Sequence, residues 1–133
     1  MSIPLTKVEQ LLGIPYDEDH FDCAEFVAHV QRQLFDRDVR LPGERPHGAE
    51  GQAAMGELSK AYASPREGAP QDGDLVLMFE LGQKRPSHAG VYFRLAHEDW
   101  VLHSNEKNGC SVLHRVRELG GWGLRIEGYY AWA

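Results

Sequence analysis

The chain changes character near Pro70, and this change constrains the fold more than any other feature of the sequence. Before Pro70, apolar residues recur at helical spacing; after it, short β-branched and aromatic segments are separated by turn residues. Helices followed by a run of strands are typical of an α+β domain. We therefore predict one domain over residues 1–133, with N-terminal helices packed on an antiparallel β-meander. The helices are expected over 3–12, 23–36 and 50–62, and the strands over 74–79, 88–93, 100–103, 111–116 and 125–132.

Charge and hydropathy disfavour two classes of partner. The net charge at pH 7 is −6 and the lysines and arginines are scattered, so the chain lacks the basic footprint that nucleic-acid binding requires. No apolar run approaches the ~20 residues that span a bilayer, so we expect no membrane insertion. The first ten residues lack a basic segment followed by an apolar one. We therefore expect synthesis in the cytoplasm without a signal peptide, so that action elsewhere depends on delivery by another component.

Cys23 stands at the predicted start of the second helix, where a thiol can become a nucleophile. Asp22 is a favourable N-cap residue, and Glu25 follows it at the spacing of a capping box. Unpaired N–H groups and the positive end of the helix dipole favour a thiolate in the first turn. A buried, inert cysteine is the alternative interpretation, because free cysteine is among the most buried residue types.

Two histidines in successive predicted strands are the candidates for a base and its orienting partner. His88 opens strand 88–93, and His103 lies in strand 100–103. If these strands pair as a hairpin, the two imidazoles can be neighbours on one face of the sheet. A cysteine, a histidine and a polar third group are the parts of a papain-like thiol hydrolase. The remaining histidines receive no catalytic role: His29 is expected to be solvated, and His47, His97 and His114 to be surface or structural.

A zinc site is the competing interpretation of the same residues. His20 and Cys23 are three residues apart, and His88 and His103 could complete a set of four ligands. Zinc sites are usually marked in sequence by a closely spaced pair of ligand residues at each end of the motif, and such pairs are missing at both ends here. A disulfide between Cys23 and Cys110 is not expected, because the N-terminal residues resemble those of a cytosolic protein and there is no CxxC pair. We predict Cys110 to be structural.

Five blocks of sequence carry a family resemblance. They are Gly13-Ile14-Pro15-Tyr16, Phe21-Asp22-Cys23-Ala24-Glu25-Phe26-Val27, Gly73-Asp74-Leu75-Val76, Ser87-His88-Ala89-Gly90-Val91-Tyr92 and Leu102-His103-Ser104. In order and character they resemble the NlpC/P60 family of cysteine peptidases, from about residue 11 to residue 116. The resemblance implies a papain-like α+β fold and hydrolysis of amide bonds in bacterial cell-wall stem peptides, without a cofactor. The bond commonly cut lies between γ-D-glutamate and meso-diaminopimelate or lysine.

The resemblance also implies residue roles and partners. Cys23 would be the nucleophile, His88 the base and His103 the orienting third residue. Tyr16 matches a family tyrosine near the oxyanion site; a packed loop aromatic is its alternative. The small single-domain chain without a signal peptide resembles the phage-tail and prophage members of the family. The implied partners are peptidoglycan stem peptides, with phage-tail or secretion-apparatus proteins as the means of delivery to the cell wall.

Two departures from the family pattern bear on specificity and function. Glu25 stands where the family usually has glycine, and it is either a capping partner alone or a carboxylate that opposes the thiolate or narrows the acyl-binding cleft. Residues 41–70 have no evident family equivalent and are expected to form a lid or a docking surface. Two other functions therefore stay open: a wall-docking or assembly module with little turnover, and a thiol amidase or acyltransferase on the same fold.

Overall fold

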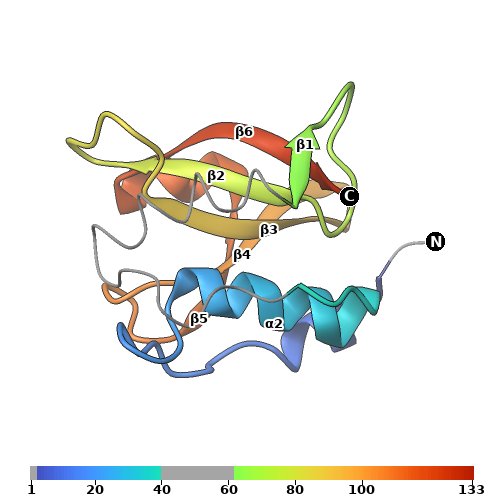
Figure 1. The fold of residues 1–133 in the computed structure, drawn as a ribbon. Helices are drawn as coiled ribbons and strands as arrows, with labels where there is room; N and C mark the ends of the chain where they lie inside the picture. The colour runs from blue at the N-terminus through green and yellow to red at the C-terminus, as the bar shows by residue number, and fades with distance from the viewer. Residues whose placement is uncertain (1–2, 40–61) are drawn as a thin grey trace.

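A computed structural model describes residues 3–39 and 62–133 of the chain. The elements of this part are α1 (Leu5–Glu9), α2 (Cys23–Phe35), β1 (Ala63–Pro65), β2 (Leu75–Glu80), β3 (His88–Leu95), β4 (Glu98–Ser104), β5 (Ser111–Arg115), the 3-10 helix η1 (Val116–Trp122) and β6 (Leu124–Trp132). Helix α2 lies against an antiparallel sheet, which confirms the predicted α+β class (Figure 1). The helix predicted over 50–62 lies outside the described residues, apart from Tyr62, which is in a turn.

The first helix is shorter than the predicted span of 3–12. α1 ends at Glu9, and the next backbone bond, from Leu11 N–H to Val8 O (3.0 Å), spans three residues instead of four. Such 3-10 turns interrupt the α-helical ladder. Val8 and Leu11 are buried as the helical spacing predicted, whereas Leu5 and Leu12 are exposed.

The second helix forms almost where it was predicted. Local signals set both ends: the Asp22 side chain caps the first turn, and Asp36 closes the helix in the left-handed conformation with φ of 53°. Phe26, Val27 and Val30 form its buried stripe. This stripe packs α2 against β3 and β4.

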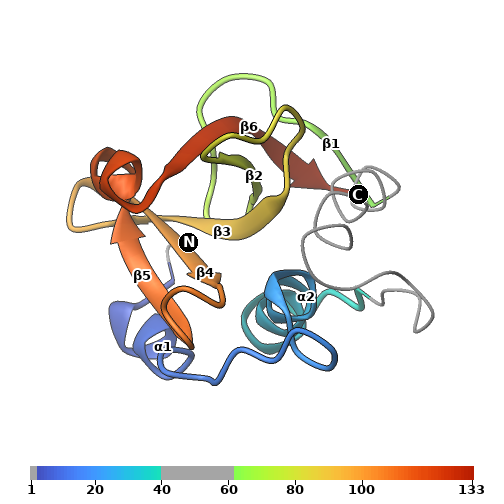
Figure 2. The same ribbon diagram turned by 90° about the vertical axis from the view of Figure 1, so that its left-hand side faces the viewer.

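The six strands of the described chain form one sheet in the order β1-β6-β2-β3-β4-β5. Strands β2 to β5 make the predicted meander, each paired antiparallel with the next. β6 departs from the meander because it returns to pair with β2 on the side away from β3. Figure 2 shows β6 crossing from η1, which follows β5, back towards β1. The meander was therefore predicted correctly for the four strands β2 to β5, and β6 adds a non-local pairing with β2.

The sequence analysis missed β1 and η1. β1 is a three-residue edge strand that includes Pro65, and a proline within a run argues against a strand unless the strand lies at an edge. η1 contains Gly120 and Gly121, which are poor helix formers. Its start is held by the backbone N–H of Arg115, which donates to the Glu118 carboxylate at 3.0 Å. In both cases the local sequence signal was weak.

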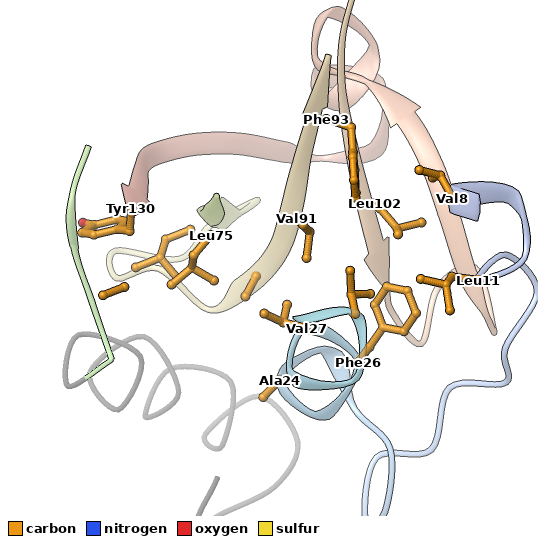
Figure 3. Close-up of a cluster of buried hydrophobic side chains, with 14 of the residues drawn as sticks. Val8, Leu11, Ala24, Phe26, Val27, Leu75, Val91, Phe93, Leu102 and Tyr130 are labelled. Carbon is orange, nitrogen blue, oxygen red and sulfur yellow. The ribbon is translucent and has the colours of Figure 1, made fainter. Parts of the chain in front are cut away.

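The sheet has a buried apolar cluster on each face. Leu75 and Leu77 of β2 belong to the cluster beneath α2, whereas the intervening Val76 belongs to the cluster beside η1. In Figure 3, Val27 of α2 points toward Val91 of β3. The first cluster fixes α2 along the sheet, and that placement positions the candidate site.

Within residues 3–39 and 62–133, no helix has the length and apolar character to cross a membrane.

Candidate active site

Cys23 is the first residue of α2, as predicted, and it is fully buried. Asp22 Oδ1 accepts hydrogen bonds from the backbone N–H groups of Ala24 (3.1 Å) and Glu25 (3.0 Å). The Asp22 half of the predicted capping box is thus present, and it fixes the first helical turn around the thiol. The positive end of the helix dipole acts on that turn and favours a thiolate there.

The packing of α2 on β3 brings Cys23 to the same end of the structure as His88. The two elements contact each other and run in the same direction (Figure 1). At their far ends, the rings of Phe35 and Phe93 stack with centroids 6.0 Å apart. From there back to Cys23 the helix extends ~18 Å, and back to His88 the strand extends ~17 Å. Because these lengths agree, the helix start that carries the thiol and the strand start that carries the imidazole lie at the same end of the packed pair.

His88 and His103 are brought into direct contact, as the predicted hairpin required. Strands β3 and β4 pair antiparallel, and His88 Nε2 lies 2.8 Å from His103 Nδ1. Both side chains are buried, with exposed fractions of 2% and 0%. Gly90 makes room for this pair, because a Cβ at Gly90 would lie 3.1 Å from His103 Cβ and 2.6 Å from Val101 Cγ1. The sequence therefore predicted this pair of neighbours correctly.

Burial keeps both imidazoles neutral at pH 7. It lowers the pKa of His88 to about 4, because a charged ring would lose its hydration. It also lowers the pKa of His103 well below the usual value, and the positive charges that His88 and His114 would carry lower it further. His88 Nε2 is engaged with His103, whereas His88 Nδ1 is buried and has no hydrogen-bond partner within residues 3–39 and 62–133. Nδ1 is thus the nitrogen of His88 that remains available for proton exchange.

A third histidine, His114 on β5, joins this pair, whereas the sequence analysis predicted it to be surface or structural. His114 Nδ1 lies 3.0 Å from His103 Nε2. Its ring stacks on Trp122 of η1, with centroids 4.8 Å apart and an interplanar angle of 14°. Burial lowers the pKa of His114, while the nearby Glu118 charge opposes that effect. The sequence analysis placed His114 within the predicted strand 111–116, but only the pairing of β5 with β4 brings it to His103.

Tyr16 is held in a loop that is tied to the start of β5. Its backbone N–H donates to Gly109 O at 3.0 Å, and the preceding Pro15 forms a β-bridge with Cys110. Tyr16 is half-buried, and its oxyanion role stays a prediction.

Cys110 is free and half-buried, with its backbone in the β-bridge to Pro15, which agrees with a structural role. Neither Cys23 nor Cys110 is part of a disulfide.

The other histidines that the structure describes lie apart from the His88–His103–His114 cluster. His20 is exposed and interacts with the Asp17 carboxylate at 3.3 Å. His29, which was expected to be solvated, is half-buried edge-on against Phe21, with ring centroids 5.6 Å apart. His97 is exposed in the turn between β3 and β4, and His47 lies outside the described residues.

The four residues of the zinc interpretation do not assemble. Across residues 3–39 and 62–133, no group of three or more His, Cys, Asp or Glu side chains is arranged to hold a metal ion. His88 and His103 instead turn ring nitrogens toward each other at hydrogen-bond distance. The geometry is that of a hydrogen-bonded imidazole pair rather than of ligands converging on one centre.

Comparison with known proteins decides the family. A model of the NlpC/P60 family matches residues 13–122, which include Tyr16, Cys23, His88 and His103. The chain belongs to the NlpC/P60 family. Membership of NlpC/P60 supports a cell-wall hydrolase or peptidase at the level of the family, and the antiparallel sheet with its packed helix is consistent with the papain-like NlpC/P60 fold. No curated protein matches the chain. The phage-tail subtype and the route of delivery stay predictions.

Proposed function

We propose that this NlpC/P60 protein is a cysteine endopeptidase that hydrolyses amide bonds in peptidoglycan stem peptides, of the γ-D-glutamyl–diaminopimelate type. One arrangement supports the proposal most: the capped helix start at Cys23 is at the same end of the packed α2 and β3 as the buried His88–His103 pair. A thiol, a neutral imidazole with an available nitrogen and a group that orients the imidazole are the components of nucleophilic acyl transfer.

In the acylation step, His88 Nδ1 takes the proton from the thiol of Cys23, and the sulfur attacks the carbonyl carbon of the stem peptide. The C–N bond then breaks as His88 returns the proton to the leaving amine, which leaves a thioester on Cys23. A water molecule next gives its proton to His88 while its oxygen attacks the thioester carbon. The C–S bond breaks, the acid is released and the proton returns to sulfur. General acid–base catalysis of this kind typically contributes ~10²–10⁴-fold.

His103 and Tyr16 have supporting roles in this proposal. His103 Nδ1, 2.8 Å from His88 Nε2, accepts the Nε2 proton and so holds His88 with its Nδ1 lone pair toward the thiol. The hydroxyl of Tyr16, together with the backbone N–H of Cys23, donates to the oxyanion of the tetrahedral intermediate. A donor of this kind is typically worth ~2.7–4 kcal/mol of the barrier.

The decisive experiment is mass spectrometry of purified muropeptides with diaminopimelate stems after incubation with the protein. Wild type and Cys110→Ala should release one defined stem fragment, whereas Cys23→Ala and His88→Ala should release none or nearly none. Cys110→Ala is the matched control, since it also removes a free cysteine but leaves the histidine pair intact. The mass of the fragment identifies the bond that is cut.

Two results would count against the proposal. Equal losses in Cys23→Ala and Cys110→Ala would remove Cys23 from the mechanism. Absence of cleavage by the wild type, combined with retained binding to intact cell walls, would favour the wall-docking module. Cleavage at a different amide bond, or transfer of the acyl group to an added amine, would favour the amidase or acyltransferase.

A further inference from the structure

The His88–His103 pair continues into a chain of three imidazoles that ends at His114. The two N···N contacts are 2.8 Å and 3.0 Å, and each joins an Nε2 atom to the Nδ1 atom of the next ring. Both nitrogens of the central His103 therefore face another imidazole, and His103 has an exposed fraction of 0%. The steps of the proposed reaction use only the first contact of this chain. The role of His114 is open, and the inference about it below rests on the proposed function.

The proton positions along this chain are coupled. Each N···N contact between neutral imidazoles holds a single proton, so one nitrogen must donate and the other must accept. A neutral chain with both contacts made has only two arrangements: N–H on every Nε2, or N–H on every Nδ1. Only the first leaves a lone pair on His88 Nδ1, where the proposed reaction needs a base. In the second, His88 Nδ1 already carries a proton and cannot accept one from the thiol.

His114 supplies the acceptor that the productive arrangement requires. If His103 Nδ1 accepts from His88, the proton of neutral His103 lies on Nε2, which needs an acceptor because an unpaired buried donor is costly. His114 Nδ1 is that acceptor in this structure. A doubly protonated His103 would donate at both ends, but burial and the neighbouring rings lower its pKa.

The position of the His114 ring is fixed by η1. Trp122, the last residue of η1, stacks nearly parallel on the imidazole at 4.8 Å. The Lys107 ammonium lies 5.9 Å from the centroid of the same indole, and the Glu118 charge acts on His114. These contacts hold the ring in the plane that directs Nδ1 to His103. Helix η1 thus fixes the orientation of His114, the last ring of the histidine chain.

We propose that His114 is a positioning residue of this site, which holds the His88–His103–His114 chain in the arrangement that leaves a lone pair on His88 Nδ1. It touches neither substrate nor nucleophile in this proposal and acts through His103. An orienting amide or carboxylate has a fixed acceptor oxygen, but an orienting histidine needs a partner of its own to define its tautomer. His114 meets that need here.

The first test is the tautomer of each histidine in the full chain, read by long-range ¹H–¹⁵N correlation NMR on ¹⁵N-histidine-labelled protein near pH 7. We expect both His88 and His103 of the wild type to carry their proton on Nε2. A wild-type His88 that is protonated on Nδ1 would overturn the proposal without any variant. This measurement needs no substrate, so it stands even if the muropeptide experiment shows no cleavage.

Two substitutions at His114 separate positioning from packing. His114→Phe keeps a ring to stack on Trp122 but has no nitrogen, whereas His114→Asn places an amide group near the position of Nδ1. We expect His114→Phe to move His103 away from the Nε2–H tautomer and to lower kcat/KM by about 10–100-fold, the size of loss seen when the hydrogen-bond partner of a metal-bound histidine is removed. His114→Asn should restore the tautomer and most of the activity. Equal losses in both, with the wild-type tautomer kept, would indicate a packing role and refute the proposal.

A double-mutant cycle provides the control for structural damage. In His103→Asn the amide oxygen accepts from His88 whatever occupies position 114, so adding His114→Phe should lower kcat/KM by less than about 3-fold further. A merely structural role of His114 predicts the same loss in both backgrounds. If no substrate is cleaved, the rate of alkylation of Cys23 by iodoacetamide replaces kcat/KM throughout this cycle, and the same coupling is expected.

Discussion

Acid should destabilise this protein because its folded state buries neutral histidines. Burial lowers the pKa of His88 to about 4 in the folded chain, whereas an exposed histidine in the unfolded chain has a pKa of about 6.5. Between these two values the unfolded state binds a proton that the folded state does not. The free energy of unfolding therefore falls as the pH drops through this window, and the stability is fully present only above it.

The size of the effect follows from the two pKa values. For a single group, the pKa falls from about 6.5 in the unfolded chain to about 4 in the folded chain. Proton linkage then lowers the free energy of unfolding by about 2 kcal/mol between pH 7 and pH 5, and by about 3 kcal/mol between pH 7 and pH 4. His103, whose pKa is also lowered by burial, adds a loss in the same direction. For a domain with a total stability of ~5–15 kcal/mol, this is a large fraction.

Urea unfolding followed by tryptophan fluorescence at pH 7, 6 and 5 measures this loss directly. His88→Gln removes the titrating ring but keeps a hydrogen-bonding side chain, so its stability should fall by about 2 kcal/mol less than that of the wild type between pH 7 and pH 5. His97→Asn is the matched control, because it removes an exposed histidine from the turn after β3. If wild type and His88→Gln lost stability in parallel, the argument that His88 is held neutral by burial would be refuted.

Three further outcomes are expected. Asp22→Ala removes the acceptor of two N–H groups at the start of α2 and should cost about 1 kcal/mol by urea unfolding; a value near zero would show that the cap does not fix the helix start. Gly90→Ala places a Cβ 2.6 Å from Val101 Cγ1 and should cost about 1–3 kcal/mol, with a loss of muropeptide cleavage that exceeds the loss of folded protein. His103→Asn should keep part of the cleavage activity, because an amide oxygen still accepts the His88 Nε2 proton; activity as low as that of His88→Ala would mean that His103 does more than orient.

The sequence alone predicted those parts of the site that depend on local signals. Asp22 and Glu25 marked the start of α2, because a cap satisfies N–H groups within three residues of itself. The β-branched and aromatic residues around His88 and His103 predicted two successive strands separated by turn residues, and a hairpin of neighbouring strands has little choice of partner. The cysteine at a helix start and the neighbouring imidazoles therefore followed from residues close together in the chain.

Only the tertiary structure decided the rest, because strand pairing over long sequence separations has no local signal. β6 pairs with β2 across more than forty residues, and β1 exists only because β6 offers it an edge. The same reason explains why His114 was set aside. Its contact with His103 depends on the register of β5 against β4, and its orientation depends on Trp122, which a glycine-containing 3-10 helix brings onto the imidazole ring.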